Sequence, residues 1–177
     1  EIASLGIQVH GGMGFVEETG AAQHYRDARI APIYEGTNGI QAADLVGRKL
    51  SMDGGAVARG LVERIAAEAE GPLADLAAAT GRVLHWMQDE ASIDDKLGGS
   101  VPFLTMYATL VSGWLMAKQR AAAQDELAGG DDPFLKGKIA AADYYLAAMV
   151  PEATGLEAAA TAGAEPLYAL TAAELAA

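Results

Sequence analysis

The spacing of core-type side chains along residues 73–87 constrains the fold of this chain more than any other feature. Six of these side chains recur at intervals of one, three or four residues: Leu73, Leu76, Thr80, Val83, Leu84 and Met87. This is the spacing of one face of an α-helix. Pro72 directly precedes the series, and proline is favoured in the first turn of a helix. A helix with such a face must bury it against other elements, so the pattern predicts a packed helical domain.

Several other segments show the same periodicity, and alanine is abundant throughout. We predict helices over the following ranges: 56–70, 72–88, 101–127, 133–151 and 152–162. A polar connector over 89–99 and a glycine-containing break over 129–133 separate the longer helices, and we expect a frayed tail from Pro166. Pro151 should end or kink its helix. Four main antiparallel helices with short connections predict an all-α, up-and-down bundle.

Residues 1–50 have shorter predicted elements. We expect the end of a helix over 1–8, a glycine-rich loop over 11–15, a helix over 21–29, and a helix from Thr37 or Asn38 to Leu50. The segment Ser51–Gly55 should interrupt the chain, so we place one domain boundary there and predict domains over 1–50 and 51–177. The chain opens without an initiator methionine, and we expect it to be a piece of a longer protein.

Composition argues against several classes of function. The 177 residues carry a net charge of −12, which argues against nucleic acid and anionic membranes as partners. The absence of cysteine excludes thiolate metal sites and disulfides. His10, His24 and His85 lie on separate elements, so no metal site is predicted. We also expect no membrane span and a cytoplasmic location.

Three short sequence segments, which we call the three blocks, contain the residues that bear on a possible reaction. They are Gln8–Phe15 (QVHGGMGF), Tyr25–Arg29 (YRDAR) and Ile33–Gln41 (IYEGTNGIQ). In this order and spacing they resemble the C-terminal helical domain of the acyl-CoA dehydrogenases. They are most similar to the subgroup with an extra C-terminal helical extension, which includes methylthiopropionyl-CoA dehydrogenase-like enzymes. The resemblance implies that residues 51–177 form that extension, after the last helices of the catalytic α-domain.

The resemblance also implies a reaction and its residues. An enzyme of this kind uses FAD to oxidise an acyl-CoA thioester to the 2,3-enoyl-CoA, with the hydride going to flavin N5. Glu35 matches the base that removes the α-proton, and Ile33 and Tyr34 would help to exclude water from it. The implied contacts with the substrate and the flavin are made by these residues: Tyr34 and Gly36 for substrate; Gln8, Val9, His10, Gly11, Gly12, Thr37, Asn38 and Gly39 for FAD. The earlier parts of the family's fold are absent, so Glu35 should be exposed and the chain alone inactive.

The segment Gln8–Gly12 matches one that reaches the flavin of a neighbouring subunit, which implies a homo-oligomer, either a dimer or a tetramer. The implied partners are the acyl-CoA and, as electron acceptor, the electron-transfer flavoprotein. Two alternatives stay open from the residues. One is a helical assembly module of a catalytically degenerate homologue, and the other is an acyl-CoA oxidase that passes electrons to oxygen.

Overall fold

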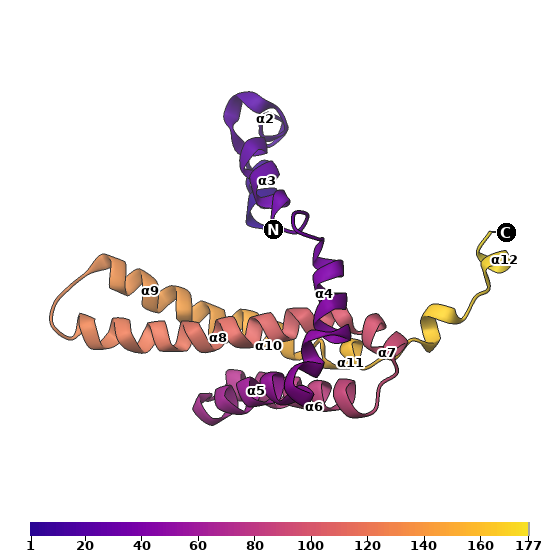
Figure 1. Ribbon diagram of the computed structural model, residues 1–177. Coiled ribbons are helices and arrows are strands. Elements are labelled where there is room, and N and C mark those ends of the chain that lie inside the picture. Colours follow the sequence, from indigo (N-terminus) through magenta and orange to yellow (C-terminus); the bar gives the residue numbers. More distant parts are fainter. Residues whose placement is uncertain (177) are drawn as a thin grey trace. The chain divides into compact units, whose positions relative to one another are not determined.

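The computed structural model describes residues 1–176, and every regular element in them is a helix (Figure 1). The prediction of an all-α fold is confirmed. The chain divides after Gln41 into two compact units. We call residues 1–41 the N-terminal unit and the chain from Ala42 onward the C-terminal unit.

The N-terminal unit is built on two helices that pack along each other, α1 and α3. Its elements are α1 (Ile2–Val9), α2 (Gly12–Phe15), the 3-10 helix η1 (Glu17–Thr19), α3 (Ala21–Ile30) and the first residues of α4 (Asn38–Gly47). The prediction of a loop over 11–15 is wrong in part, because Gly11, with φ 62°, only interrupts the helix, and a new turn starts at Gly12. Gly14 in this turn is obligatory, since a Cβ there would lie 2.2 Å from the Ile7 backbone oxygen.

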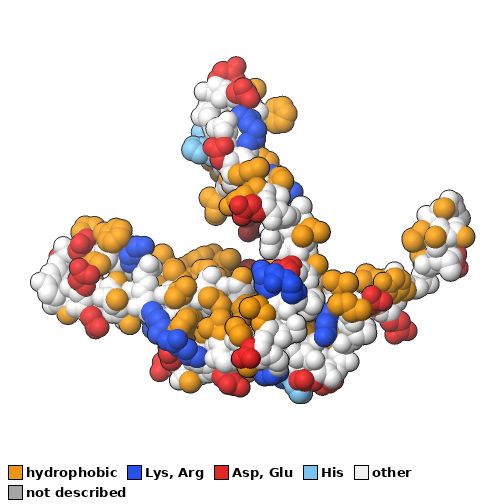
Figure 2. Space-filling view, in the orientation of Figure 1, with side chains coloured by type: hydrophobic (Ala, Val, Ile, Leu, Met, Phe, Trp, Pro, Cys, Tyr) orange, Lys and Arg blue, Asp and Glu red, His pale blue; other side chains and the backbone are white. Residues whose placement is uncertain are grey.

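Few side chains of this unit are buried. Among residues 1–41, only Gly14, Ala21 and Ala22 reach the buried class. Large apolar side chains stay on the surface, including Val9 at 87% exposure and Phe15 at 83%. Figure 2 shows hydrophobic side chains scattered over the surface of this unit.

The C-terminal unit is a helical bundle that holds the main core. From the end of α4 its elements are the 3-10 helix η2 (Lys49–Gly55), α5 (Ala56–Glu68), α6 (Pro72–Asp89), α7 (Ile93–Gly98), α8 (Ser100–Leu127), α9 (Pro133–Tyr144), the π-helix η3 (Tyr145–Met149), α10 (Val150–Thr154), α11 (Glu157–Ala160), the 3-10 helix η4 (Glu165–Tyr168) and α12 (Ala172–Leu175).

Helix α6 lies at the centre of this core and packs against α5, α8 and α10. All six positions that the spacing assigned to its inner face are buried. They meet Ile65 of α5 and Phe103, Met106 and Leu110 of α8, which are each 0% exposed. The longest hairpin of the unit is formed by α8 and α9, which run side by side in Figure 1.

Three local predictions need correction. The connector over 89–99 contains α7, which begins because Ser92 and Asp95 form a capping box. The regular helix α9 ends at Tyr144, before Pro151 is reached. The next turn widens into η3, and the proline lies at the start of α10, where its missing N–H is tolerated. The tail after Pro166 contains α12, whose first turn is capped by Thr171 and Glu174.

The expectation of no membrane span overlooked one helix. No residue between Lys96 and Lys118 carries a charge. Among the described residues, α8 alone is long and apolar enough to cross a membrane by length and composition. A core helix of a helical bundle meets the same criteria, and α8 packs against α6, α9, α10 and α11.

Candidate active site

The loop that carries Glu35 follows α3 and is closed by backbone hydrogen bonds. The N–H groups of Ile33 and Tyr34 both donate to the Ile30 oxygen, at 3.0 and 3.1 Å, which turns the chain at the end of the helix. The Asn38 N–H then donates to the Pro32 oxygen at 3.2 Å. These bonds bring the start of α4 back to the end of α3, with Glu35 at the tip of the loop.

The backbone of Glu35 is in the left-handed region, with φ 54°, and Gly36 follows with φ 91°. For a residue with a side chain this conformation costs roughly 1–2 kcal/mol. The Gln41 side-chain amide holds it in place by donating to the Glu35 backbone oxygen at 2.8 Å. Strained residues that the surrounding structure holds in this way cluster at active sites. The sequence showed the carboxylate but contained no sign of this strain.

The same loop presents several free backbone donors. Within residues 1–176, no hydrogen-bond acceptor is found for the N–H of Glu35, Gly36, Thr37 or Gly39. Thr37 is the N-cap of α4, because its hydroxyl accepts from the Ile40 N–H at 3.3 Å. This settles the choice that the sequence left between Thr37 and Asn38. Free N–H groups at the start of a helix form a site that favours anions.

The Glu35 carboxylate is exposed, as expected for this chain alone. Its apolar neighbours do not shield it here, since Ile33 is 49% exposed and Tyr34 57%. The loop therefore supplies an exposed carboxylate on a fixed backbone together with open amides, while the walls of a pocket around them are not supplied by residues 1–41.

The second predicted segment, Gln8–Gly12, lies elsewhere in the unit. It ends α1, whereas Glu35 follows α3, and the two helices are packed so that α2 and the Glu35 loop lie at opposite ends of the pair (Figure 1). The 10 residues of α3 separate the ends by about 15 Å. A Cβ on Gly11 or Gly12 would meet no atom within 4 Å, so the backbone there is open. The structure thus groups Tyr34–Gly39 together and keeps Gln8–Gly12 apart from them.

No group of three or more His, Asp or Glu residues able to hold a metal ion occurs in the described part of the chain. In the N-terminal unit, Arg26 and Asp27 do not pair with each other. Both bond to Gln23, at 2.8 and 2.6 Å, and Arg26 also lies 3.3 Å from Glu17. These contacts are those of residues that stabilise α3.

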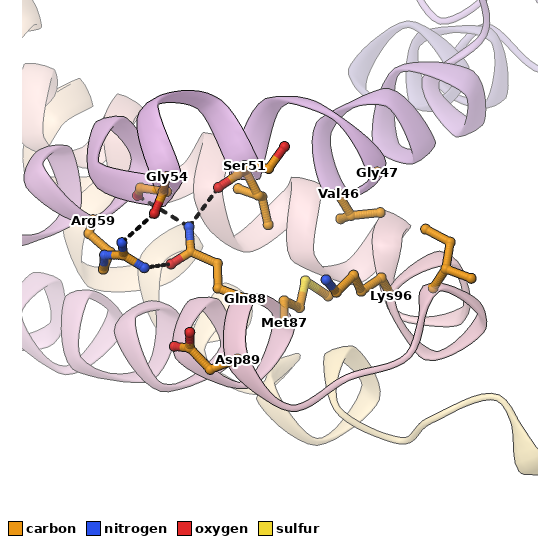
Figure 3. A pocket seen from close by; sticks show the side chains of 12 residues that line it. Val46, Gly47, Ser51, Gly54, Arg59, Met87, Gln88, Asp89 and Lys96 are labelled. Carbon is orange, nitrogen blue, oxygen red and sulfur yellow. Dashed lines mark hydrogen bonds between the residues drawn. The ribbon is translucent and has the colours of Figure 1, made fainter.

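Sequence reasoning missed a pocket in the C-terminal unit, where α4, η2, α5, α6 and α7 meet (Figure 3). Arg59 donates to the Gln88 side-chain oxygen at 2.6 Å and to the Gly54 backbone oxygen at 2.7 Å. The Gln88 amide nitrogen donates to the Leu50 oxygen at 2.7 Å. The one visible signal was the turn Asp53–Gly55, which the sequence identified only as a break between helices.

Two family models match this chain, one over most of the C-terminal unit and one over residues 1–50. The family model described as "Acetyl-CoA dehydrogenase C-terminal like" matches residues 43–171, and that described as "Acyl-CoA dehydrogenase, C-terminal domain" matches residues 1–50. The chain belongs to the acyl-CoA dehydrogenase family. The resemblance seen in the three sequence blocks is thereby confirmed.

Relatives in this family differ in how much of the chain they share. The chain is 48% identical to 3-methylmercaptopropionyl-CoA dehydrogenase of Ruegeria pomeroyi over 169 residues, which is 86% of this chain and 29% of the relative. It is 34% identical to a broad-specificity linear acyl-CoA dehydrogenase of Mycobacterium tuberculosis, over 82% of this chain and 28% of the relative. The human mitochondrial short-chain specific acyl-CoA dehydrogenase is 53% identical over 49 residues, which is 28% of this chain and 12% of the relative. The chain spans less than a third of the length of these relatives.

Proposed function

We propose that this chain forms the C-terminal part of an FAD-dependent acyl-CoA dehydrogenase, in which Glu35 removes the α-proton of an acyl-CoA thioester. One observation carries the proposal: Glu35 is held in a left-handed conformation at the tip of a loop whose neighbouring N–H groups are free. Membership of the family supports the general reaction.

The residues of the loop have distinct tasks in this proposal. The Glu35 carboxylate accepts the α-proton, and the free N–H of the same residue donates to the thioester oxygen, where negative charge develops. Gly36 has no side chain, so the acyl group can approach the backbone closely. Tyr34 lies beside the base and contributes an apolar wall for the substrate.

The start of α4 suits the cofactor. Thr37 and Asn38 supply polar side chains there, and Thr37 and Gly39 supply free N–H groups at a helix N-terminus, which fits a phosphate of FAD. FAD, when bound, supplies the acceptor for the hydride that leaves the β-carbon. The open segment Gln8–Gly12, at the other end of the α1–α3 pair, would serve the FAD of a second subunit, which makes the enzyme a homo-oligomer.

We further propose a cytoplasmic enzyme with electron-transfer flavoprotein as its electron acceptor. The name of the Ruegeria relative makes 3-methylmercaptopropionyl-CoA the first substrate to assay. Straight-chain acyl-CoAs follow, because the Mycobacterium relative is named for broad specificity toward linear substrates.

The Glu35→Gln substitution in the intact enzyme tests the proposal. It keeps the size of the side chain and removes its basicity, so we expect kcat to fall by about 10²- to 10⁴-fold. FAD content, measured by absorbance, should be unchanged. Glu18→Gln is the matched control, since Glu18 is also exposed in the N-terminal unit and lies in η1, away from the loop. Full activity of the Glu35→Gln enzyme would exclude Glu35 as the base.

A further inference from the structure

The pocket between η2 and α6 is a cavity of about 180 Å³ in the C-terminal unit. Its apolar wall is made by buried side chains: Val46, Leu50 and Met87. An engineered cavity of roughly 150 Å³ holds a benzene molecule, so this one has room for a ligand of about six to eight non-hydrogen atoms.

The rim of the pocket is a turn in the left-handed region, and polar side chains hold its backbone. Asp53, Gly54 and Gly55 have φ of 50°, 60° and 87° in succession. Arg59 and Gln88 bind the backbone oxygens of this segment and each other (Figure 3). A Cβ on Gly55 would lie 2.7 Å from the Gln88 amide nitrogen, so this glycine is needed for the arrangement.

The lysine and arginine side chains that line the pocket differ from most others of the C-terminal unit, because they form no ion pair within the described residues. Of the ten Lys and Arg residues between 42 and 176, seven form an ion pair with a carboxylate within the described residues: Arg48, Lys49, Arg64, Arg82, Lys118, Arg120 and Lys136. Two of the three others, Arg59 and Lys96, line this one pocket. In a chain with 24 acidic and 12 basic residues, these two cations therefore have no carboxylate partner within residues 1–176, and they lie at opposite ends of the pocket in Figure 3.

Lys96 is the cation that a ligand can reach. Its side chain extends from α7 toward Met87 and Gln88 in Figure 3 and is partly buried. It makes no hydrogen bond or ion pair within residues 1–176, whereas Arg59 is engaged by Gln88 and Gly54. Asp89 also lines the pocket and brings one carboxylate to it, which lies 2.8 Å from His85 Nδ1.

We propose that this pocket binds a small carboxylate with a short apolar tail. The carboxylate meets the Lys96 ammonium, and the tail lies against Val46, Leu50 and Met87. A partly buried ammonium gains a charge-assisted hydrogen bond in this way, and the buried apolar wall gains contact with the tail. The inference does not rest on the proposed function, because all its residues belong to the C-terminal unit.

Titration of the 177-residue chain with butanoate, followed by ¹H–¹⁵N NMR, tests the proposal. Butanoate should shift the amide signals of Gly54 and Gly55, and butanamide, which has the same shape without charge, should bind at least about tenfold more weakly. Lys96→Met should remove this difference between the two compounds. Lys138→Met is the matched control, since Lys138 is also partly buried, forms no ion pair in the described residues and lies outside the pocket.

Three results would overturn the proposal. They are equal binding of butanoate and butanamide to the wild-type chain, no shift at Gly54 and Gly55, and shifts caused by inorganic phosphate but not by butanoate. The wild-type comparison decides the question even if Lys96→Met fails to fold, and Lys96→Gln then provides a second uncharged variant.

Discussion

Asp95 links two distant parts of the chain through one carboxylate. It accepts from the Ser92 hydroxyl at 2.7 Å and the Ser92 N–H at 3.1 Å, and also from the Ala164 N–H at 2.8 Å. The Ser92 hydroxyl, followed by the backbone N–H groups of Ala164 and Ser92, holds the pKa of the Asp95 carboxyl below its ordinary value. The ionised side chain therefore fixes both the start of α7 and the segment that leads to η4.

This lowered pKa predicts how stability depends on pH. A carboxyl whose pKa is lower in the folded state stabilises the fold fully above its ordinary pKa of ~3.9, and this contribution is lost as the pH falls through the lowered value. Asp95→Asn should therefore be less stable than wild type at neutral pH, with the difference narrowing below about pH 4. Urea unfolding of both proteins at a series of pH values measures this difference in the free energy of unfolding.

Asp94→Asn is the control for this experiment, because Asp94 is the exposed neighbour and makes no hydrogen bond within the described residues. It removes the same charge from the same helical turn. If Asp95→Asn and Asp94→Asn change the free energy of unfolding with pH in the same way, the effect comes from the loss of a negative charge near α7 and not from the hydrogen bonds of Asp95.

At the scale of elements, the start of α8 depends on a close contact with α11. A Cβ on Gly99 would lie 2.1 Å from the Ala160 backbone oxygen, which cannot move away without shifting α11. On Gly98, the nearest atoms to a Cβ lie at 3.4 Å. Gly99→Ala should therefore destabilise the chain by about 1–3 kcal/mol, and Gly98→Ala should change its stability by less than about 1 kcal/mol. Denaturant unfolding measures the stabilities of the two variants. Equal stabilities would show that Gly99 of α8 does not lie in close contact with Ala160 of α11.

The elements also show which features a sequence reveals. The inner face of α6 was predictable because its periodicity reflects burial directly. Helix α7 was not, because it is only 6 residues long and begins with a capping box in a polar segment. The three sequence blocks predicted Glu35 as the base, but they gave no sign of its left-handed backbone, whose oxygen accepts a bond from Gln41. The pocket of Lys96 combines residues from five elements, which meet only in the folded chain.

For the whole molecule, the two units differ in how much they bury. The C-terminal unit has a continuous core in which Ile65, Leu76 and Phe103 are fully buried. The N-terminal unit buries only a glycine and two alanines among residues 1–41. Burial of apolar surface is the main favourable term in folding, and each buried large side chain contributes about 1.5–3 kcal/mol. The N-terminal unit therefore has little to stabilise it by itself.

This difference predicts separate opening of the units in the 177-residue chain. Regions with few buried contacts open locally at low free-energy cost, whereas core helices open only with global unfolding. Amide hydrogens of α1 and α3 should exchange at least about 100-fold faster, relative to their intrinsic rates, than those of α6, which corresponds to about 2.8 kcal/mol. Hydrogen exchange followed by mass spectrometry measures the exchange rates of α1, α3 and α6 in one sample. Equal protection of α1 and α6 in the chain alone would contradict the division into a weakly and a strongly stabilised unit.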